Sequence, residues 1–240
     1  METPKAANNR YVFFYVGDDI TQPQMLASSI RRVDVSAEIV HCADTETPEI
    51  SGIDRRVNVE GDRRFLMSYR LKAFANSLVD GPAVYMDTDM LCLRPIESGS
   101  LTKVGSARFC RREFACDLPF NGRFRNMDLM EYDRLALGTV YPYVACTTIT
   151  NHAQVWAELL ATLESMSEKF RIWYGDQEAI KAYVVNHGIP INQALPESKF
   201  GCLPEYFKLN RDAYALHFKG SARKSLMEQV WGNFKDVIDH

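Results

Sequence analysis

Short apolar runs alternate with amphipathic stretches along this chain. Residues 11–16 (YVFFYV) are dense in β-branched and aromatic side chains and end at a Gly-Asp-Asp turn sequence, which predicts a strand buried on both faces. Residues 21–30 then carry apolar side chains at helical spacing, after a Thr and a Gln at capping-box spacing, and predict a helix. The same criteria predict further strands at 38–42, 57–59, 83–86, 103–109, 143–149, near Ile191 and at 213–218, and further helices at 65–78, after Asn151, at 176–186 and at the C-terminal end.

This order of elements, with helices between strands, predicts an α/β fold with a mostly parallel central sheet flanked by helices. The length of 240 residues suits a single domain over 1–240, and residues 1–10, ahead of the first strand, are expected to be flexible. The stretch 110–142 mixes Arg, Asp, Asn, Gly and Phe, with only a weak helical pattern at 127–137. Long irregular stretches in compact domains are usually functional loops or disordered segments.

Composition and charge narrow the class of partner. The formal net charge is -3 and the isoelectric point is about 6.0, so the chain has no global basic field of the kind that drives nucleic-acid binding. The apolar run at 11–16 is too short for a signal core or a membrane span, whereas peripheral association with a membrane stays open. Six cysteines occur without a C-x-x-C pair or a zinc-site spacing, which indicates reduced thiols in a cytoplasmic protein.

Two aspartates follow the apolar strand predicted at 83–86. Asp87 and Asp89 are two residues apart, so in extended chain both carboxylates point to one side, where they repel unless a positive group lies between them. A hard divalent cation is the simplest such group, because it prefers oxygen ligands and bridges to phosphates. A solvated Asp-Thr-Asp turn is the alternative. Apolar residues on both sides of the motif favour a metal site at the carboxyl end of a buried strand.

The segment 85–96 (YMDTDMLCLRPI) resembles the metal-binding D-x-D motif of glycosyltransferases with the GT-A fold, and is most similar to family 8, the glycogenin and lipopolysaccharide galactosyltransferase type. The further segments that match this family in order are YVGDD at 15–19, YRLK at 69–72, WYGDQE at 173–178, and HFKG with two basic residues at 217–224. The chain departs from the family at 143–148, where a small Asn-x-Gly turn is usual, and at Arg223, where Lys is usual. The resemblance implies one Rossmann-like GT-A domain over nearly the whole chain.

The resemblance also implies roles for individual residues. Asp87, Asp89 and His217 would ligate Mn²⁺ (or Mg²⁺), although a lone His at the end of an apolar strand is otherwise a buried core residue. Asp176 and Gln177 would be the catalytic residues beside the donor sugar, although an Asp there is also an ordinary helix N-cap. The residues expected to bind the donor are Tyr15, Val16, Asp18 and Asp19 at the base, Arg70 and Lys72 on a helix, Asp87 and Thr88 in the motif, and Lys219, Gly220, Arg223 and Lys224 at the diphosphate. A solvated helix start is the alternative for that last basic cluster.

The expected function is hexosyl transfer from a nucleotide-diphosphate sugar, above all a UDP-hexose, to a glycan or glycolipid acceptor in polysaccharide biosynthesis. The resemblance implies retention of the anomeric configuration, and we expect the acceptor at 110–142. A Mg²⁺-dependent phosphatase of the haloacid dehalogenase type is the rival, because it too has two aspartates two apart after an apolar strand. In that fold the pair lies on the first strand and precedes Gly-Thr. A catalytically silent module that binds a nucleotide sugar is a further alternative.

Overall fold

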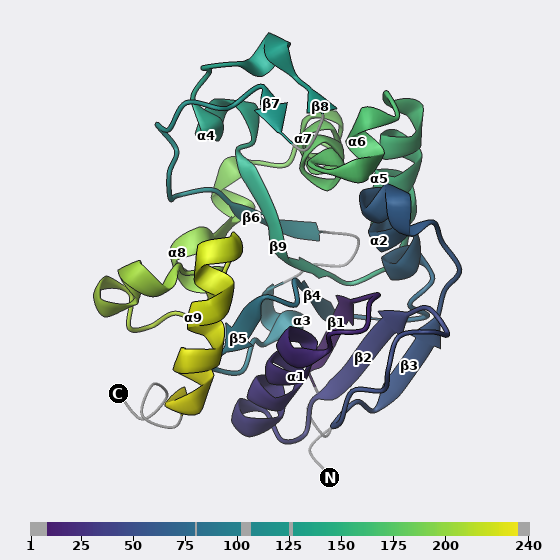
Figure 1. Ribbon diagram of the computed structural model, residues 1–240, viewed down its shortest axis with the longest axis vertical. Helices are drawn as coiled ribbons and strands as arrows, with labels where there is room; N and C mark the ends of the chain where they lie inside the picture. The colour runs from purple at the N-terminus through teal and green to yellow at the C-terminus, as the bar shows by residue number, and fades with distance from the viewer. Residues whose placement is uncertain (1–8, 80, 102–106, 125–126, 235–240) are drawn as a thin grey trace, which may run out of the picture.

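The computed structural model describes residues 9–79, 81–101, 107–124 and 127–234 (Figure 1). Most of the N-terminus expected to be flexible, residues 1–8, lies outside them, as does part of the strand expected at 103–109. Among the described residues the main sheet has seven strands in the order β10-β6-β9-β4-β1-β2-β3. The sheet is mostly parallel, since only β9 runs antiparallel to its neighbours, β4 and β6. The predicted α/β fold with flanking helices is confirmed.

The described residues form strands, α-helices and short 3-10 helices with the following bounds. The strands are β1 (Arg10–Phe14), β2 (Glu38–Ala43), β3 (Arg55–Asn58), β4 (Ala83–Met86), β5 (Met90–Cys92), β6 (Ala107–Arg111), β7 (Arg123–Phe124), β8 (Met127–Asp128), β9 (Tyr143–Thr150), β10 (Leu195–Pro196) and β11 (Ala215–His217). The α-helices are α1 (Thr21–Val33), α2 (Leu66–Ala75), α3 (Ser98–Leu101), α4 (Leu137–Val140), α5 (Gln154–Ser165), α6 (Lys169–Ile172), α7 (Gly175–Asn186), α8 (Glu197–Phe200) and α9 (Ser221–Gly232). The 3-10 helices are η1 (Arg63–Phe65), η2 (Met130–Tyr132), η3 (Ile191–Gln193) and η4 (Pro204–Leu209). None of the described helices has the length and apolar character needed to cross a bilayer.

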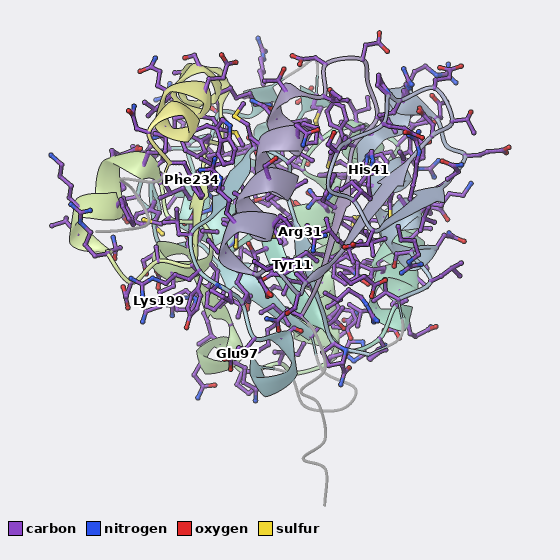
Figure 2. All side chains as sticks on the ribbon, turned by 90° about the horizontal axis from the view of Figure 1, so that it is seen from below. Tyr11, Arg31, His41, Glu97, Lys199 and Phe234 are labelled. Carbon is purple, nitrogen blue, oxygen red and sulfur yellow. The ribbon has the colours of Figure 1, made fainter. Side chains whose placement is uncertain are left out.

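Helices cover both faces of the main sheet. Successive strand residues point to opposite sides, so a strand that is apolar at every position must be covered on both. Tyr11 and Phe13 of β1 pack with α1, whereas Val12 packs into the cluster formed with α2, α5 and α7. Figure 1 shows α2, α5, α6 and α7 grouped together, apart from α1 and α9, and Figure 2 shows Tyr11 in the region of α1. All four residues of β4 are buried, since this strand lies between β1 and β9.

Where the structure describes the region 110–142, it contains the end of β6 and otherwise only short elements, namely β7, β8, η2 and α4. Two backbone hydrogen bonds join its first half to its second: the Phe120 N–H donates to the Leu135 carbonyl, and the Arg134 N–H donates to the Phe120 carbonyl. The helical pattern expected at 127–137 is wrong, because the segment forms β8, the single turn of η2 and further turns. Its apolar side chains pack in a cluster of aromatic rings instead, where Tyr132 contacts Phe120.

Two further local expectations are corrected by the structure. The segment at Ile191 is the 3-10 helix η3 and not a strand, because Pro190 begins a turn there, and the edge strand β10 follows it. The capping box expected at Thr21 does not form. Asp19 accepts the Thr21 N–H instead, and the Gln24 side chain bonds to the backbone of residue 51.

The six cysteines are free, and five of them are buried; Cys116 is partly exposed. Their side chains therefore serve as packed thiols, as the absence of paired spacing predicted.

His41 makes the stability of this fold depend on pH. The ring stacks on Phe13, its Nε2 lies 3.2 Å from the Tyr15 carbonyl oxygen, and Figure 2 labels it on the sheet. Burial lowers the pKa of His41 to about 4. The unfolded chain therefore binds a proton at His41 more readily than the folded chain does. The burial of neutral His41 contributes its full share to the unfolding free energy above the ordinary histidine pKa, and this share is lost as pH falls from there through about 4.

We expect the wild type to lose about 2 kcal/mol more unfolding free energy than a His41→Gln variant between pH 7.5 and pH 5. Glutamine keeps an N–H donor for the Tyr15 carbonyl but does not titrate. Urea unfolding of both proteins at the two pH values measures this difference. Equal losses in the two proteins would contradict the assignment.

Candidate functional site

The D-x-D motif forms the turn between β4 and β5, at the carboxyl end of β4. The Asp87 N–H donates to the Cys146 carbonyl in β9 (2.9 Å), which continues the β4–β9 ladder by one residue. β1 lies parallel to β4 on its other side, with Phe13 paired to Met86, so both strands end at the same edge. Thr88, between the aspartates, is half-buried. This edge is the usual position of ligand sites in α/β proteins.

His217 reaches the same place from the far end of the chain. β11 pairs antiparallel with β5, which sets His217 opposite Met90. The Phe218 N–H then donates to the Asp89 carbonyl (2.8 Å) and extends this ladder to the motif itself. As a result, His217 Nε2 lies 3.4 Å from Asp89 Oδ1 and 3.9 Å from Asp87 Oδ2.

These three side chains fit a divalent metal ion. One ligand atom from each residue lies within 4.8 Å of the others. The set offers two carboxylates and one imidazole, a combination that Mn²⁺ accepts more readily than Mg²⁺ does. His217 and Asp89 are 4% and 16% exposed, so the ion would be largely shielded from bulk water. The sequence-predicted ligands are therefore brought together.

The charges in this cluster depend on one another. Burial raises the pKa of Asp87 to about 7, although Arg70 opposes the shift. Burial also acts to raise the pKa of Asp89. The charge of His217 and the hydrogen bond between His217 and Asp89 outweigh burial, so the pKa of Asp89 is lowered. Burial would lower the pKa of His217, yet Cys146 and Asp89 raise it to about 10. His217 and Asp87 must therefore release protons before they act as metal ligands.

Arg70 on α2 connects the motif to α7. Its Nη2 lies 2.7 Å from Asp87 Oδ1 and donates to the Ala145 carbonyl (2.7 Å), and its Nη1 donates to Asp176 Oδ2 (3.0 Å). The guanidinium thus neutralises two carboxylates of the site instead of standing free for a donor phosphate. Lys72 is exposed and is not brought to this cluster, because helix positions two apart face different sides.

Asp176 and Gln177 lie in the first turn of α7. The Asp176 side chain is 6% exposed. Burial raises its pKa, and the charge of Arg70 opposes that shift. The N-cap residue of α7 is Tyr174, so Asp176 is not the helix cap. Tyr174 has φ 59°, a left-handed conformation unusual for a residue with a side chain, and its ring stacks on Tyr141 at 4.8 Å.

We expect Gly175→Ala to displace this turn. An added Cβ would lie 2.0 Å from the Phe170 carbonyl oxygen and 2.5 Å from Leu163 Cδ1. Relieving such overlap costs about 1–3 kcal/mol of unfolding free energy and moves Asp176 away from its partner. The matched control is Gly232→Ala, where the added Cβ meets nothing within 4 Å. Urea unfolding should separate the two variants, and equal stabilities would be evidence against the close packing at α7.

Lys224 is the basic residue that approaches the metal cluster from α9. Its Nζ lies 4.0 Å from Asp89 Oδ2, and its side chain is 50% exposed. Gly220, with φ 86°, is the N-cap residue of the same helix. A phosphate beside Asp89 would therefore meet a cation and the start of a helix.

Two other predicted phosphate ligands are held by carboxylates that sequence reasoning missed. Lys219 Nζ lies 2.6 Å from Oε1 of Glu197, which is fully buried. Arg223 pairs with Glu205 of η4. Neither glutamate carries a sequence signal, since each is distant in the chain from the cation that it pairs with.

The segment 15–19 lies beyond the carboxyl end of β1, next to β4 in the sheet. The Tyr15 hydroxyl donates to the Asp19 carbonyl (2.6 Å) and closes this turn. The Asp19 carboxylate accepts a backbone N–H at the start of α1 (3.0 Å). Asp18 and Asp19 are both exposed, and Val16 is partly buried. The turn thus lies at the same sheet edge as the motif, and both of its acids are exposed.

Comparison with known proteins places this geometry in a structural class. No protein-family profile and no curated protein matches the chain. A glycosyltransferase involved in the glycosylation of the major capsid of PBCV-1 matches with a TM-score of 0.59 and 11% identity, over 93% of this chain and 100% of the other. The glycosyltransferase GlyE of Streptococcus pneumoniae TIGR4 matches with a TM-score of 0.55 and 12% identity, over 97% of this chain and 63% of the other.

The bifunctional glycosyltransferase WbbM, in its apo structure, matches with a TM-score of 0.56 and 12% identity, over 92% of this chain and 47% of the other. Identities this low carry information about the fold alone. The chain therefore has the GT-A-like fold of glycosyltransferases, with an acidic and histidine cluster at its D-x-D turn that could bind a metal ion.

Proposed function

We propose that this protein is a metal-dependent glycosyltransferase of the family 8 type, which moves a hexose from a nucleotide-diphosphate donor, UDP-hexose above all, to a glycan or glycolipid acceptor with retention of configuration. The observation that carries the proposal is the convergence of Asp87, Asp89 and His217 at the carboxyl end of β4 in a glycosyltransferase-like fold. In this fold class, function follows from the site and not from the topology alone.

Transfer from such a donor requires that negative charge appearing on the departing diphosphate be stabilised. A bound Mn²⁺ would supply preorganised positive charge for this purpose. Lys224, beside Asp89, adds a second positive charge at the same place. Arg70 holds Asp87 and Asp176 at fixed positions, so that the first can act as a ligand and the second can face the sugar.

The acceptor and the cellular compartment are also part of this proposed function. We assign the acceptor to the region 110–142, whose first residues lie beside Gln177. The free thiols support a reducing, cytoplasmic compartment. A glycolipid acceptor would bring the protein to a membrane surface as a peripheral enzyme of polysaccharide biosynthesis.

Calorimetric titration of UDP tests the donor site, first with Mn²⁺ and then with EDTA. Binding that requires the metal supports the proposal, and hydrolysis of UDP-hexoses then identifies the donor. UDP binding without any turnover would favour a silent nucleotide-sugar module. Release of phosphate from a phosphomonoester with Mg²⁺, without nucleotide binding, would favour the phosphatase. The D-x-D position after β4, and not after β1, speaks against that rival.

A further inference from the structure

Arg112 is a buried cation next to the proposed sugar site. It follows β6 at the start of the region 110–142 and is 9% exposed. Its backbone N–H donates to the Pro142 carbonyl (2.8 Å), so the residue is fixed where the two ends of that region meet. Burial of a charge in this way is costly unless the charge is paired.

In the part of the chain that the structure describes, both hydrogen-bond partners of the Arg112 guanidinium are neutral. Its Nε donates to the Tyr141 carbonyl (2.7 Å), and its Nη2 donates to Gln177 Oε1 (3.0 Å). Among the residues that the structure describes, no carboxylate lies within 4.0 Å of this guanidinium, whereas Arg70 meets two. Arginine has five N–H donors. Two are used here, so three remain on Nη1 and Nη2.

Gln177 reinforces the positive character of this place. Because Oε1 accepts the bond from Arg112, the amide end left over is its N–H donor end. The adjacent Asp176 is paired elsewhere, because its Oδ2 accepts from Arg70 and its Oδ1 accepts the Gln177 backbone N–H. Arg112 and Gln177 therefore present one net positive charge together with N–H donors from both side chains.

We propose that Arg112 and Gln177 bind the carboxylate of an acidic sugar, so that the substrate contains a uronic acid. The proposal rests on the proposed glycosyltransferase function. A planar carboxylate can accept two parallel bonds from a guanidinium and would supply the counter-charge that the described protein lacks here. Contacts from Arg112 through Gln177 to Asp176 and Arg70 join this place to the metal cluster. The uronic acid is therefore the donor sugar or the acceptor residue next to it.

The wild-type protein, with Mn²⁺, tests this inference directly. In the donor arm, binding and hydrolysis of UDP-glucuronate and UDP-galacturonate are compared with UDP-glucose and UDP-galactose. In the acceptor arm, the methyl glycosides of the same four sugars are compared as ligands of the UDP complex. We expect an acidic sugar to be preferred about tenfold or more in one arm, which identifies its source. Equal affinity for acidic and neutral sugars in both arms overturns the proposal.

Two variants assign the preference to Arg112. Arg112→Met should reduce it to about twofold or less while UDP affinity with Mn²⁺ stays near the wild-type value, and Arg112→Lys should keep part of it, since the charge remains without the planar fork. Arg211→Met, at an exposed position outside the region 110–142, is the matched control and should keep the preference in full. Preference retained in folded Arg112→Met overturns the inference. Loss of UDP binding in the wild type would instead be a failure of the proposed function.

Discussion

Replacing Asp89 with alanine is expected to weaken Mn²⁺-dependent UDP binding by at least about 100-fold and to remove transfer activity. Loss of a residue behind a metal ligand already costs about 10- to 100-fold in metal affinity, and Asp89 is itself placed as a ligand. Its two oxygens face His217 (3.4 Å) and Lys224 (4.0 Å), so it lies between the imidazole and the phosphate-side cation. The backbone should stay in place, because the bond from Phe218 is accepted by the Asp89 carbonyl and not by its side chain.

The measurement is calorimetric titration of UDP with Mn²⁺ into the wild type and the variant, with EDTA as the metal-free reference. Asp89→Asn tests whether charge or shape matters, since it keeps the volume and removes the negative charge. Glu164→Ala, on the exposed side of α5, removes one carboxylate elsewhere and should bind UDP as the wild type does. Metal-dependent UDP binding at wild-type affinity in Asp89→Ala would show that the cluster is not the metal site.

Replacing Arg70 with methionine is expected to lower the unfolding free energy by about 3–5 kcal/mol and to abolish activity. This is the usual cost of removing one partner of a buried ion pair, because the other charge is left uncompensated. Arg70 is 12% exposed and faces both Asp87 and Asp176, and it also donates to the Ala145 carbonyl. Without it, the two carboxylates would lose the positive charge that opposes their protonation.

Urea unfolding at neutral pH in the presence of EDTA measures this cost without any contribution from metal binding. Adding Asp176→Asn to Arg70→Met should recover part of the lost stability, since one uncompensated carboxylate is removed. Lys72→Met lies on the exposed side of the same helix and should change stability by no more than about 0.5 kcal/mol. If Arg70→Met were as stable as Lys72→Met, the guanidinium would not be an essential part of the site.

The position of the metal motif followed from local sequence pattern. Four apolar residues before Asp87 predict a strand, and β4 forms at 83–86 with every residue buried. The alternation of strands and helices predicted the α/β class, since each strand of this kind must be covered on both faces. The motif therefore had to lie at the carboxyl end of a central strand, which is where the structure has it.

Local pattern was least informative where the chain uses short elements. The segment at 127–137 carries apolar residues at helical spacing but forms β8 and η2, because its side chains pack against aromatic rings from other parts of the chain. β5 is only three residues long and was not recognised as a strand. Its pairing with β11 is nevertheless the contact that brings His217 to the motif.

The fold class, the D-x-D turn and the types of residue that could ligate a metal were predictable from the sequence, because they depend on periodicity and on side-chain chemistry. Contacts between distant parts of the chain determine which cations of the site are paired with carboxylates. Arg70 meets Asp176 across 106 residues, and Lys219 and Arg223 are held by Glu197 and Glu205. Lys224 lies beside Asp89, and Arg112 meets no carboxylate within 4.0 Å among the described residues. Two buried charges pair only when the fold brings them close in space, and their separation along the sequence does not predict that distance.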